Sequence, residues 1–256
     1  MSGEECIHGF EREFCDICSP RATPEPVKPV RRAPASDRTP RASRASTAGS
    51  PRGPRGPVID PSAHRVFHVT HRDALEWILD AGALVAGTET PVDLSTPLIR
   101  ELRATVPATD EASVAECVPF ALSDQASWWR DLRDGALDRT RWTDAARELR
   151  PTDLVVLVAT LGALPGVVVT DADAASAVAR VAREPEEIAR TIAKVKAGTG
   201  ALEGEALVPG SVSFDAVVLI GVANEPSRDR VRDLLADAGR GNVRVLLSPE
   251  WFSPSE

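Results

Sequence analysis

Apolar and polar residues along the chain follow two periodicities, and the shorter one predicts a set of β-strands. Residues 64–70, HRVFHVT, alternate in the way expected of a strand with one buried face. Residues 116–123, 153–161 and 166–171 are short apolar runs rich in β-branched side chains, which is typical of buried strands. Strands are also predicted in EALVPGSV, in AVVLIGVA and in VRVLLSPEWF near the carboxyl end.

The longer periodicity predicts amphipathic helices between these strands. Leu75, Ile78 and Leu79 fall at helical spacing, and Gly82 is placed to cap the end of that helix. Helices are also predicted in SDQASWWRDLRDGAL, in SRDRVRDLLADAG and in the segment from DADAA to KVKAG, which its single proline interrupts. Because strands and helices mix without strict alternation, the pattern favours an α+β fold over a doubly wound parallel sheet.

Composition divides the chain into three segments. Residues 1–18 carry a net charge of −4, residues 19–57 carry +7 and residues 58–256 carry −11. The middle segment is rich in Pro, Arg, Ser and Ala, and Val27 and Val30 are its only large apolar side chains. It cannot bury enough apolar area to offset the entropy lost on ordering. We therefore expect a disordered basic linker followed by one folded domain.

The charge distribution limits the classes of partner. An acidic folded domain argues against a protein that coats nucleic acid without specificity, because such proteins present a basic folded surface. The basic linker either contacts phosphate backbones or is a plain solvated connection. The chain has no apolar run of the roughly 18 residues that a membrane span needs. Its amino terminus, MSGEECIHG, lacks the apolar core of a secretory signal. We therefore expect a cytoplasmic protein with no membrane partner.

A cluster of cysteine and histidine lies near the amino terminus. Cys6-x-His8 is followed by Cys15-x-x-Cys18, and four such ligands within thirteen residues can close a tetrahedral zinc site. A disulfide framework would require an oxidising compartment, which nothing in the sequence indicates. We predict a structural zinc site, and the alternative is a tail with incidental cysteines. Cys117 lies in an apolar strand, where a core role is favoured over a nucleophilic one.

Two polar patterns in the first half of the folded domain are candidates for ligand binding. The strand at 64–70 carries His68 and Thr70 and leads into a helix. Arg100 and Arg103 lie in the polar stretch LIRELRATV. The planar fork of an arginine pairs with phosphate oxygens, so either residue could hold a polyphosphate cofactor, although most such arginines belong to a solvated face.

A third pattern is a pair of acids at the start of a predicted strand. Glu203 and Glu205 are two positions apart, so their side chains share one face of that strand. Paired carboxylates suit acid–base chemistry or the stabilisation of a developing positive charge. By spacing alone, a solvated strand edge is the favoured explanation of this pair.

Taken together and in this order, these segments resemble the DarT family of DNA ADP-ribosyltransferase toxins. The resemblance covers about His64 to Phe252, which is nearly all of the predicted folded domain. The segments that carry it are FHVTH (67–71), ILDAGAL (78–84), LIRELRATV (98–106), VPF (118–120), TD (170–171), EGEALV (203–208), IGV (220–222) and WF (251–252).

The resemblance implies an ADP-ribosyltransferase-like mixed β-sheet core with flanking helices. It implies that NAD is the co-substrate, that a base in single-stranded DNA accepts ADP-ribose, and that a macrodomain antitoxin removes it. Glu205 would stabilise the positive charge on the ribose. Arg103, with Arg100 as the alternative, would hold NAD and orient the base. His68 and Thr70 would contact the nicotinamide half of NAD.

The chain departs from the family pattern at three places, and one of them is Ala74, where the family has an Asn in the first helix. After VPF the family continues with an Arg-Ser-Pro-Met-Leu stretch, whereas this chain has ALSDQASWWRDL. Glu203 occupies the position that faces the acceptor, where a Glu goes with arginine acceptors and a Gln with DNA-modifying relatives. Three hypotheses therefore stay open: a DNA ADP-ribosyltransferase, an arginine-type protein ADP-ribosyltransferase, and a non-catalytic module that binds a partner.

Overall fold

The computed structural model describes residues 60–88 and 91–254, so the predicted zinc cluster at 1–18 and the predicted linker at 19–57 lie outside it. Within these residues the strands form one eight-stranded sheet and one small antiparallel pair of strands. The large sheet consists of β1 (Arg65–His71), β3 (Cys117–Ala121), β4 (Leu154–Thr160), β5 (Val168–Thr170), β6 (Val181–Ala182), β7 (Glu205–Pro209), β9 (Leu219–Val222) and β10 (Arg244–Leu247). The pair consists of β2 (Ala83–Val85) and β8 (Ser211–Ser213).

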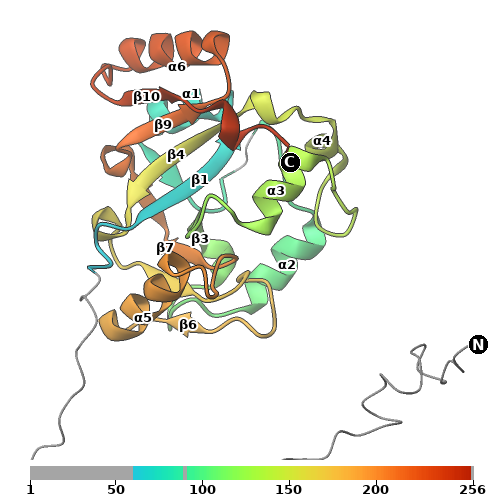
Figure 1. The fold of residues 1–256 in the computed structure, drawn as a ribbon, viewed down its shortest axis with the longest axis vertical. Coiled ribbons are helices and arrows are strands. Elements are labelled where there is room, and N and C mark those ends of the chain that lie inside the picture. Colours follow the sequence, from blue (N-terminus) through green and yellow to red (C-terminus); the bar gives the residue numbers. More distant parts are fainter. Residues whose placement is uncertain (1–59, 89–90, 255–256) are drawn as a thin grey trace, which may run out of the picture. The chain divides into compact units, whose positions relative to one another are not determined.

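The large sheet has the order β10-β9-β4-β1-β3-β7-β5-β6 (Figure 1). Every pairing within it is antiparallel except β9 with β10, which is parallel. β4 is an interior strand of the sheet: its LVVLVAT run is apolar on both faces, and six of its seven residues are buried. β1 pairs with β4 along its whole length, from Arg65 opposite Thr160 to His71 opposite Leu154. The strands and helices thus form the mixed α+β arrangement that the pattern predicted.

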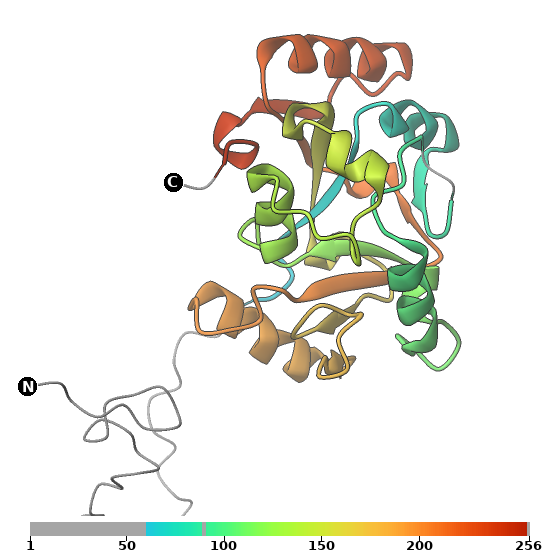
Figure 2. The same cartoon turned by 90° about the vertical axis from the view of Figure 1, so that its right-hand side faces the viewer.

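Helices cover both faces of this sheet (Figures 1 and 2). α1, α5 and α6 contribute to one core with alternate residues of β4, and α3 and α4 contribute to a second core on the opposite side. The helices are α1 (Ala74–Ala81), α2 (Pro97–Thr105), α3 (Ser127–Asp134), α4 (Asp144–Glu148), α5 (Pro185–Lys196) and α6 (Glu225–Asp237). Among the described residues, no helix combines the length and apolar character needed to cross a membrane.

Local signals account for the ends of several helices. Gly82 ends α1 in the left-handed conformation, with φ of 64°, as its position after the apolar face predicted. Pro97 begins α2, where its missing N–H costs nothing, and the Thr96 side chain accepts a hydrogen bond from the Ile99 N–H at 3.4 Å. α2, which the apolar pattern did not predict, has no buried residue.

One predicted helix is wrong in its first half. The segment that begins DADAA forms turns and β6, and the helix starts only at Pro185. Tertiary contacts replace the helical hydrogen bonds. Asp173 turns the chain by accepting the Ala175 N–H at 2.9 Å through its side chain, and the Ala174 N–H donates to Glu205 at 3.0 Å. The Ala-rich pattern has no means of indicating these partners.

The sheet separates between β1 and β3. The two strands pair only at Phe67 and Ala121, although both continue beyond that point, whereas β3 pairs with β7 from Cys117 to Ala121. The His68 ring lies in the separation and its Nδ1 is 2.8 Å from the Pro119 carbonyl oxygen. Two cavities meet at this histidine, which lines both of them.

Candidate active site

Glu205 is the first residue of β7, and the sheet determines where its side chain lies. It stands opposite Ala121 of β3, and its backbone N–H donates to the Thr170 hydroxyl at 2.9 Å. Gly204 precedes it in a position that no other residue could occupy without movement, since an added Cβ would lie 2.4 Å from the Thr170 carbonyl oxygen. The Glu205 side chain is only 9% exposed. A carboxylate so buried requires partners that offset its lost hydration.

Arg103 of α2 is the main partner of Glu205. Its Nη1 donates to Oε1 at 3.0 Å and its Nη2 donates to Oε2 at 2.8 Å, a two-point pairing of guanidinium and carboxylate. Burial disfavours the charged guanidinium, but the adjacent Glu205 outweighs burial and raises the pKa of Arg103 above its usual value. Arg100 lies elsewhere: its side chain is 46% exposed and pairs with Asp93. The structure therefore brings together Glu205 and Arg103 and leaves Arg100 outside.

A loop after β5 completes the surroundings of Glu205. The Ala174 N–H donates to Oε1 of Glu205 at 3.0 Å. The neighbouring Asp173 forms an ion pair with Arg141, which comes from the loop before α4. Burial opposes ionisation of Asp173, but Arg141 and the Ala175 N–H outweigh it and lower the pKa of this carboxyl group. The ion pair thus connects two loops and holds the backbone donor against Glu205.

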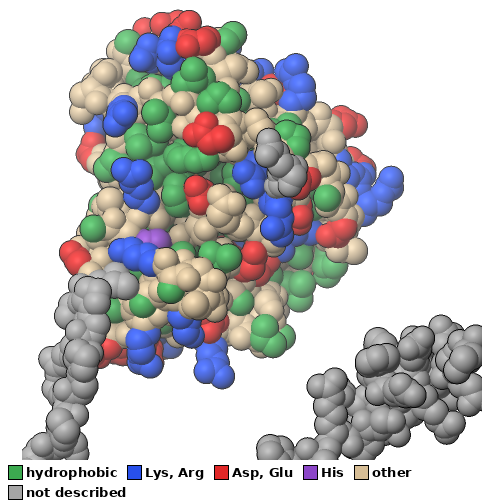
Figure 3. All heavy atoms as spheres, in the orientation of Figure 1, with side chains coloured by type: hydrophobic (Ala, Val, Ile, Leu, Met, Phe, Trp, Pro, Cys, Tyr) green, Lys and Arg blue, Asp and Glu red, His purple; other side chains and the backbone are tan. Residues whose placement is uncertain are grey.

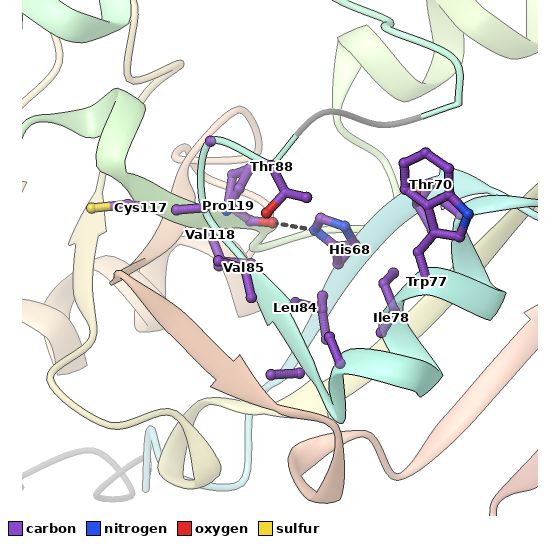
Figure 4. A pocket seen from close by; sticks show the side chains of 15 residues that line it. His68, Thr70, Trp77, Ile78, Leu84, Val85, Thr88, Cys117, Val118 and Pro119 are labelled. Carbon is purple, nitrogen blue, oxygen red and sulfur yellow. Dashed lines mark hydrogen bonds between the residues drawn. The ribbon is translucent and has the colours of Figure 1, made fainter. Parts of the chain in front are cut away.

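The first of the two cavities lies beside His68 and Thr70 (Figure 4). Its wall is mostly apolar and includes Trp77 and Ile78 of α1 together with Thr88. A carbonyl oxygen only accepts, so Nδ1 of His68 carries the proton donated to Pro119. Burial is the main effect on the ring and lowers the pKa of His68 below its usual value of 6.5. His68 is therefore neutral near pH 7, with Nε2 available as an acceptor.

The second cavity contains the ion pair and adjoins the first. His68 and Pro119 line both cavities. Arg103, Glu205 and Arg141 line the second one, together with Trp128 of α3. An elongated ligand could therefore extend past His68 from the apolar cavity to the Arg103–Glu205 pair. His68 and Thr70 were expected from the strand pattern, whereas Arg141 and Trp128 were not, because neither lies in a recognisable motif.

Glu203 does not line either cavity, although it is two residues from Glu205. Its carboxylate accepts the Ser127 N–H at 2.8 and 2.9 Å and the Ser127 hydroxyl at 2.7 Å. Ser127 is the first residue of α3, so Glu203 caps that helix. Its predicted contact with the acceptor stays a prediction, and the contact that it makes here is with α3.

Metal binding is not indicated in the part of the chain that the structure describes. Residues 60–88 and 91–254 contain no group of three or more His, Cys, Asp or Glu side chains that could hold an ion. The predicted zinc ligands, Cys6, His8, Cys15 and Cys18, lie outside these residues. Cys117 is buried in the sheet, as predicted for a core residue, and burial is the main cause that raises the pKa of its thiol.

Comparison with known proteins gives a consistent result. The family model for DarT, described as ssDNA thymidine ADP-ribosyltransferase, matches residues 67–253. The comparison with curated proteins gave no significant match. The fold resembles Thermus sp. 2.9 DarT in complex with ADP-ribosylated ssDNA, with a TM-score of 0.63 and 21% identity over 75% of this chain and 97% of that chain.

Two further structures share this fold. One is Thermus sp. 2.9 DarT in complex with NAD+, with a TM-score of 0.59 and 20% identity over 75% of this chain and 98% of that chain. The other is Thermosipho africanus DarTG in complex with ADP-ribose, with a TM-score of 0.55 and 18% identity over 74% of this chain and 51% of that chain. The family model spans most of the described residues, and the chain therefore belongs to the DarT family of single-stranded DNA thymidine ADP-ribosyltransferases.

Proposed function

We propose that this protein transfers ADP-ribose from NAD to a thymidine base in single-stranded DNA. The observation that carries the proposal is the buried pair of Arg103 and Glu205, which lies in a cavity that continues past His68 into a second, mostly apolar cavity. Family membership supplies the reaction and the acceptor class. The solved relatives named above bind NAD+ and ADP-ribosylated ssDNA, in agreement with this assignment.

NAD would lie across the two cavities. His68 and Thr70 face the apolar cavity, and the free Nε2 of neutral His68 can accept a hydrogen bond from an amide or hydroxyl group of the dinucleotide. The nicotinamide ribose would then lie near Glu205. This arrangement leaves the side of the second cavity near α3 for the acceptor.

Glu205 would act on the bond between nicotinamide and ribose. As that bond breaks, nicotinamide leaves with the bonding electron pair and positive charge builds up on the ribose. A fixed carboxylate stabilises this charge more in the transition state than in the ground state, which is the requirement for catalysis. The three donors around Glu205 fix its orientation before substrate arrives, so little reorganisation is needed.

Arg103 would serve both substrates. Its guanidinium can pair with the NAD phosphates or ribose, and it can lie beside the base nitrogen that attacks the ribose. A cation beside that nitrogen lowers its pKa, so the nitrogen releases its proton to solvent more readily. The nitrogen then forms the new bond to the ribose carbon that nicotinamide leaves. The same guanidinium holds Glu205 before substrate binds, which keeps both charged groups paired in the empty cavity.

The remaining two hypotheses have less support. Glu203 was the reason to consider an arginine acceptor, and its carboxylate is engaged by Ser127. A degenerate, non-catalytic domain would not need a buried pair with two-point geometry. On the face drawn in Figure 3, acidic and basic side chains are interspersed, so the cavity rather than a broad basic surface would select DNA.

We also propose that the chain is the toxin of a toxin–antitoxin pair. The similarity to Thermosipho africanus DarTG supports this, and this chain covers about half of that longer chain. Its antitoxin would be a macrodomain protein that removes ADP-ribose from DNA, and the toxin would act in the cytoplasm. Co-expression tests the proposal: the toxin alone should arrest growth, and the candidate antitoxin should restore it.

The amino-terminal segments complete the proposed organisation. Residues 1–18 would hold zinc through Cys6, His8, Cys15 and Cys18, and residues 19–57 would connect this site to the transferase domain at 58–256. Metal analysis of the full chain and of a chain lacking residues 1–18 would test this. One zinc per full-length chain and none in the shortened chain is the expected result.

One experiment separates the three functional hypotheses. The protein is incubated with labelled NAD and, separately, with single-stranded thymidine-containing oligonucleotide, the same oligonucleotide as a duplex, and a protein lysate. Label on the single-stranded oligonucleotide alone is expected. Label on lysate proteins would favour the arginine-type transferase. No label on any acceptor would favour the non-catalytic module.

A further inference from the structure

α3 carries two adjacent tryptophans with different surroundings. Trp129 is 3% exposed and packs edge-on against Phe252, with ring centroids 5.6 Å apart. Trp128 is only partly buried and lines the cavity that contains Arg103 and Glu205. Trp129 thus anchors the helix in the core, while Trp128 supplies a flat aromatic surface to the cavity.

Glu203 contacts the first residue of this helix. Its two carboxylate oxygens accept the N–H and the hydroxyl of Ser127, the residue directly before Trp128. A carboxylate at a helix N-terminus satisfies an otherwise unpaired backbone donor and interacts favourably with the helix dipole. Because Glu203 is two residues before Glu205, it connects the start of α3 to the strand that carries the candidate catalytic carboxylate.

The contents of this cavity suit an unpaired base. Arg103 and Arg141 supply cationic groups, and Trp128 supplies a π-surface. Cations for the backbone combined with an aromatic surface for the base are the usual features of single-strand recognition. Of these two cavities, Thr70, a predicted NAD contact, lines only the apolar one. Trp128 lines only the one that contains Arg103 and Glu205. The indole is therefore away from the apolar cavity that Thr70 lines, where the nicotinamide half of NAD is placed, and it is available to the acceptor.

We propose that Trp128 is the surface on which the acceptor base stacks, and that Glu203 is a positioning residue that holds Trp128 in place through Ser127. This inference rests on the proposed function, because it assigns how the same site receives its base. It gives Glu203 a role that involves no contact with the acceptor, and it makes the tryptophan of α3 the determinant of base binding.

Equilibrium binding tests the stacking role without requiring turnover. Fluorescence anisotropy is measured with a labelled homothymidine oligonucleotide in the presence of carba-NAD, and with an oligonucleotide of equal length whose bases are absent. Trp128→Ala should weaken binding of the first by about 5- to 150-fold, the range for loss of one base–aromatic stack, and should leave binding of the second nearly unchanged. Trp128→Phe should retain most of the affinity. Calorimetry should find the same NAD affinity in Trp128→Ala as in the unmodified protein.

Two variants of Glu203 test the positioning role. Glu203→Gln keeps an oxygen that accepts from Ser127 and should retain near-normal oligonucleotide affinity. Glu203→Ala removes the acceptor and should reproduce the loss seen with Trp128→Ala, and the double variant should lose no more than either single one. Melting temperatures confirm that each variant is folded.

Several outcomes would overturn the inference. They are equal weakening of both oligonucleotides by Trp128→Ala, a loss of NAD affinity in that variant, and a folded Glu203→Gln that binds as weakly as Glu203→Ala. A protein that does not distinguish thymidine from abasic oligonucleotide also overturns it. The protein could instead bind the thymidine oligonucleotide more tightly than the abasic one and yet never transfer label to it. That result would contradict the proposed function and would still support the stacking role.

Discussion

Arg103 and Glu205 are 102 positions apart in the chain, yet their side chains meet at two points, with Nη1–Oε1 at 3.0 Å and Nη2–Oε2 at 2.8 Å. Their side chains are 16% and 9% exposed, so water cannot readily replace either partner. Loss of one partner leaves a buried, uncompensated charge, which costs far more than loss of an exposed ion pair. α2 provides both kinds of pair, because Arg100 binds the exposed Asp93.

Arg103→Ala should therefore lower the free energy of unfolding by about 3–5 kcal/mol. Arg100→Ala is the matched control on the same helix, and its effect should stay below about 1 kcal/mol. Urea denaturation monitored by tryptophan fluorescence measures both. Replacing Arg103 and Glu205 together by apolar residues should restore part of the stability. Equal effects of the two single variants would contradict the assignment of Arg103 to the buried pair.

Gly204→Ala should destabilise the start of β7. The added Cβ would lie 2.4 Å from the Thr170 carbonyl oxygen and 2.8 Å from Cδ1 of Leu122, and overpacking of this kind costs about 1–3 kcal/mol. Gly241→Ala is the control, because a Cβ there meets nothing within 4 Å. A lower melting temperature for Gly204→Ala alone is expected. An unchanged melting temperature would mean that the strand can shift without cost.

Two histidines whose pKa values are lowered in the folded protein, His64 and His68, should make stability depend on pH. Nε2 of His64 lies 2.8 Å from the Leu122 carbonyl oxygen, and burial is the main cause that lowers the pKa of both His64 and His68 below 6.5. The unfolded chain then binds protons at a higher pH than the folded protein does. Their contribution to stability should be complete above about pH 6.5 and should be lost as pH falls through the lowered folded values.

Urea midpoints measured from about pH 7.5 to about pH 5 test this dependence. Replacing His68 by Gln should reduce the slope below pH 6.5, since one of the two titrating groups is then absent. A midpoint that rises on acidification through this range would show that the histidines are stabilised in their charged form.

Much of the fold could be predicted from the sequence where a local pattern determines the outcome. β1 and β4 were predictable because alternation and β-branched runs directly report burial in a sheet. The segment after β5 was not, because its hydrogen bonds go to Asp173 and Glu205, partners that periodicity cannot identify. The strand order and the separation of β1 from β3 likewise depend on long-range packing.

The residues of the candidate site likewise divide into those that a local pattern predicts and those that only the folded chain brings together. Glu205 and His68 were predictable because their spacing and their neighbours in the chain resemble family motifs. Arg103 could not be separated from Arg100 by sequence, since only the rotation of α2 distinguishes the side chain that faces β7. Trp128 and Arg141 contribute to the cavity from loops and helix starts outside any motif, and only the folded chain brings them together.

The catalytic role of Glu205 is tested most directly by the rate at which Glu205→Gln transfers label from NAD to a single-stranded homothymidine oligonucleotide. The amide keeps the size of the side chain but removes the charge, so the rate should fall by at least about 10²–10³-fold, while the protein remains folded. Glu101→Gln, which alters an exposed carboxylate on α2, should transfer label at the normal rate. Transfer by Glu205→Gln at the normal rate would contradict the account.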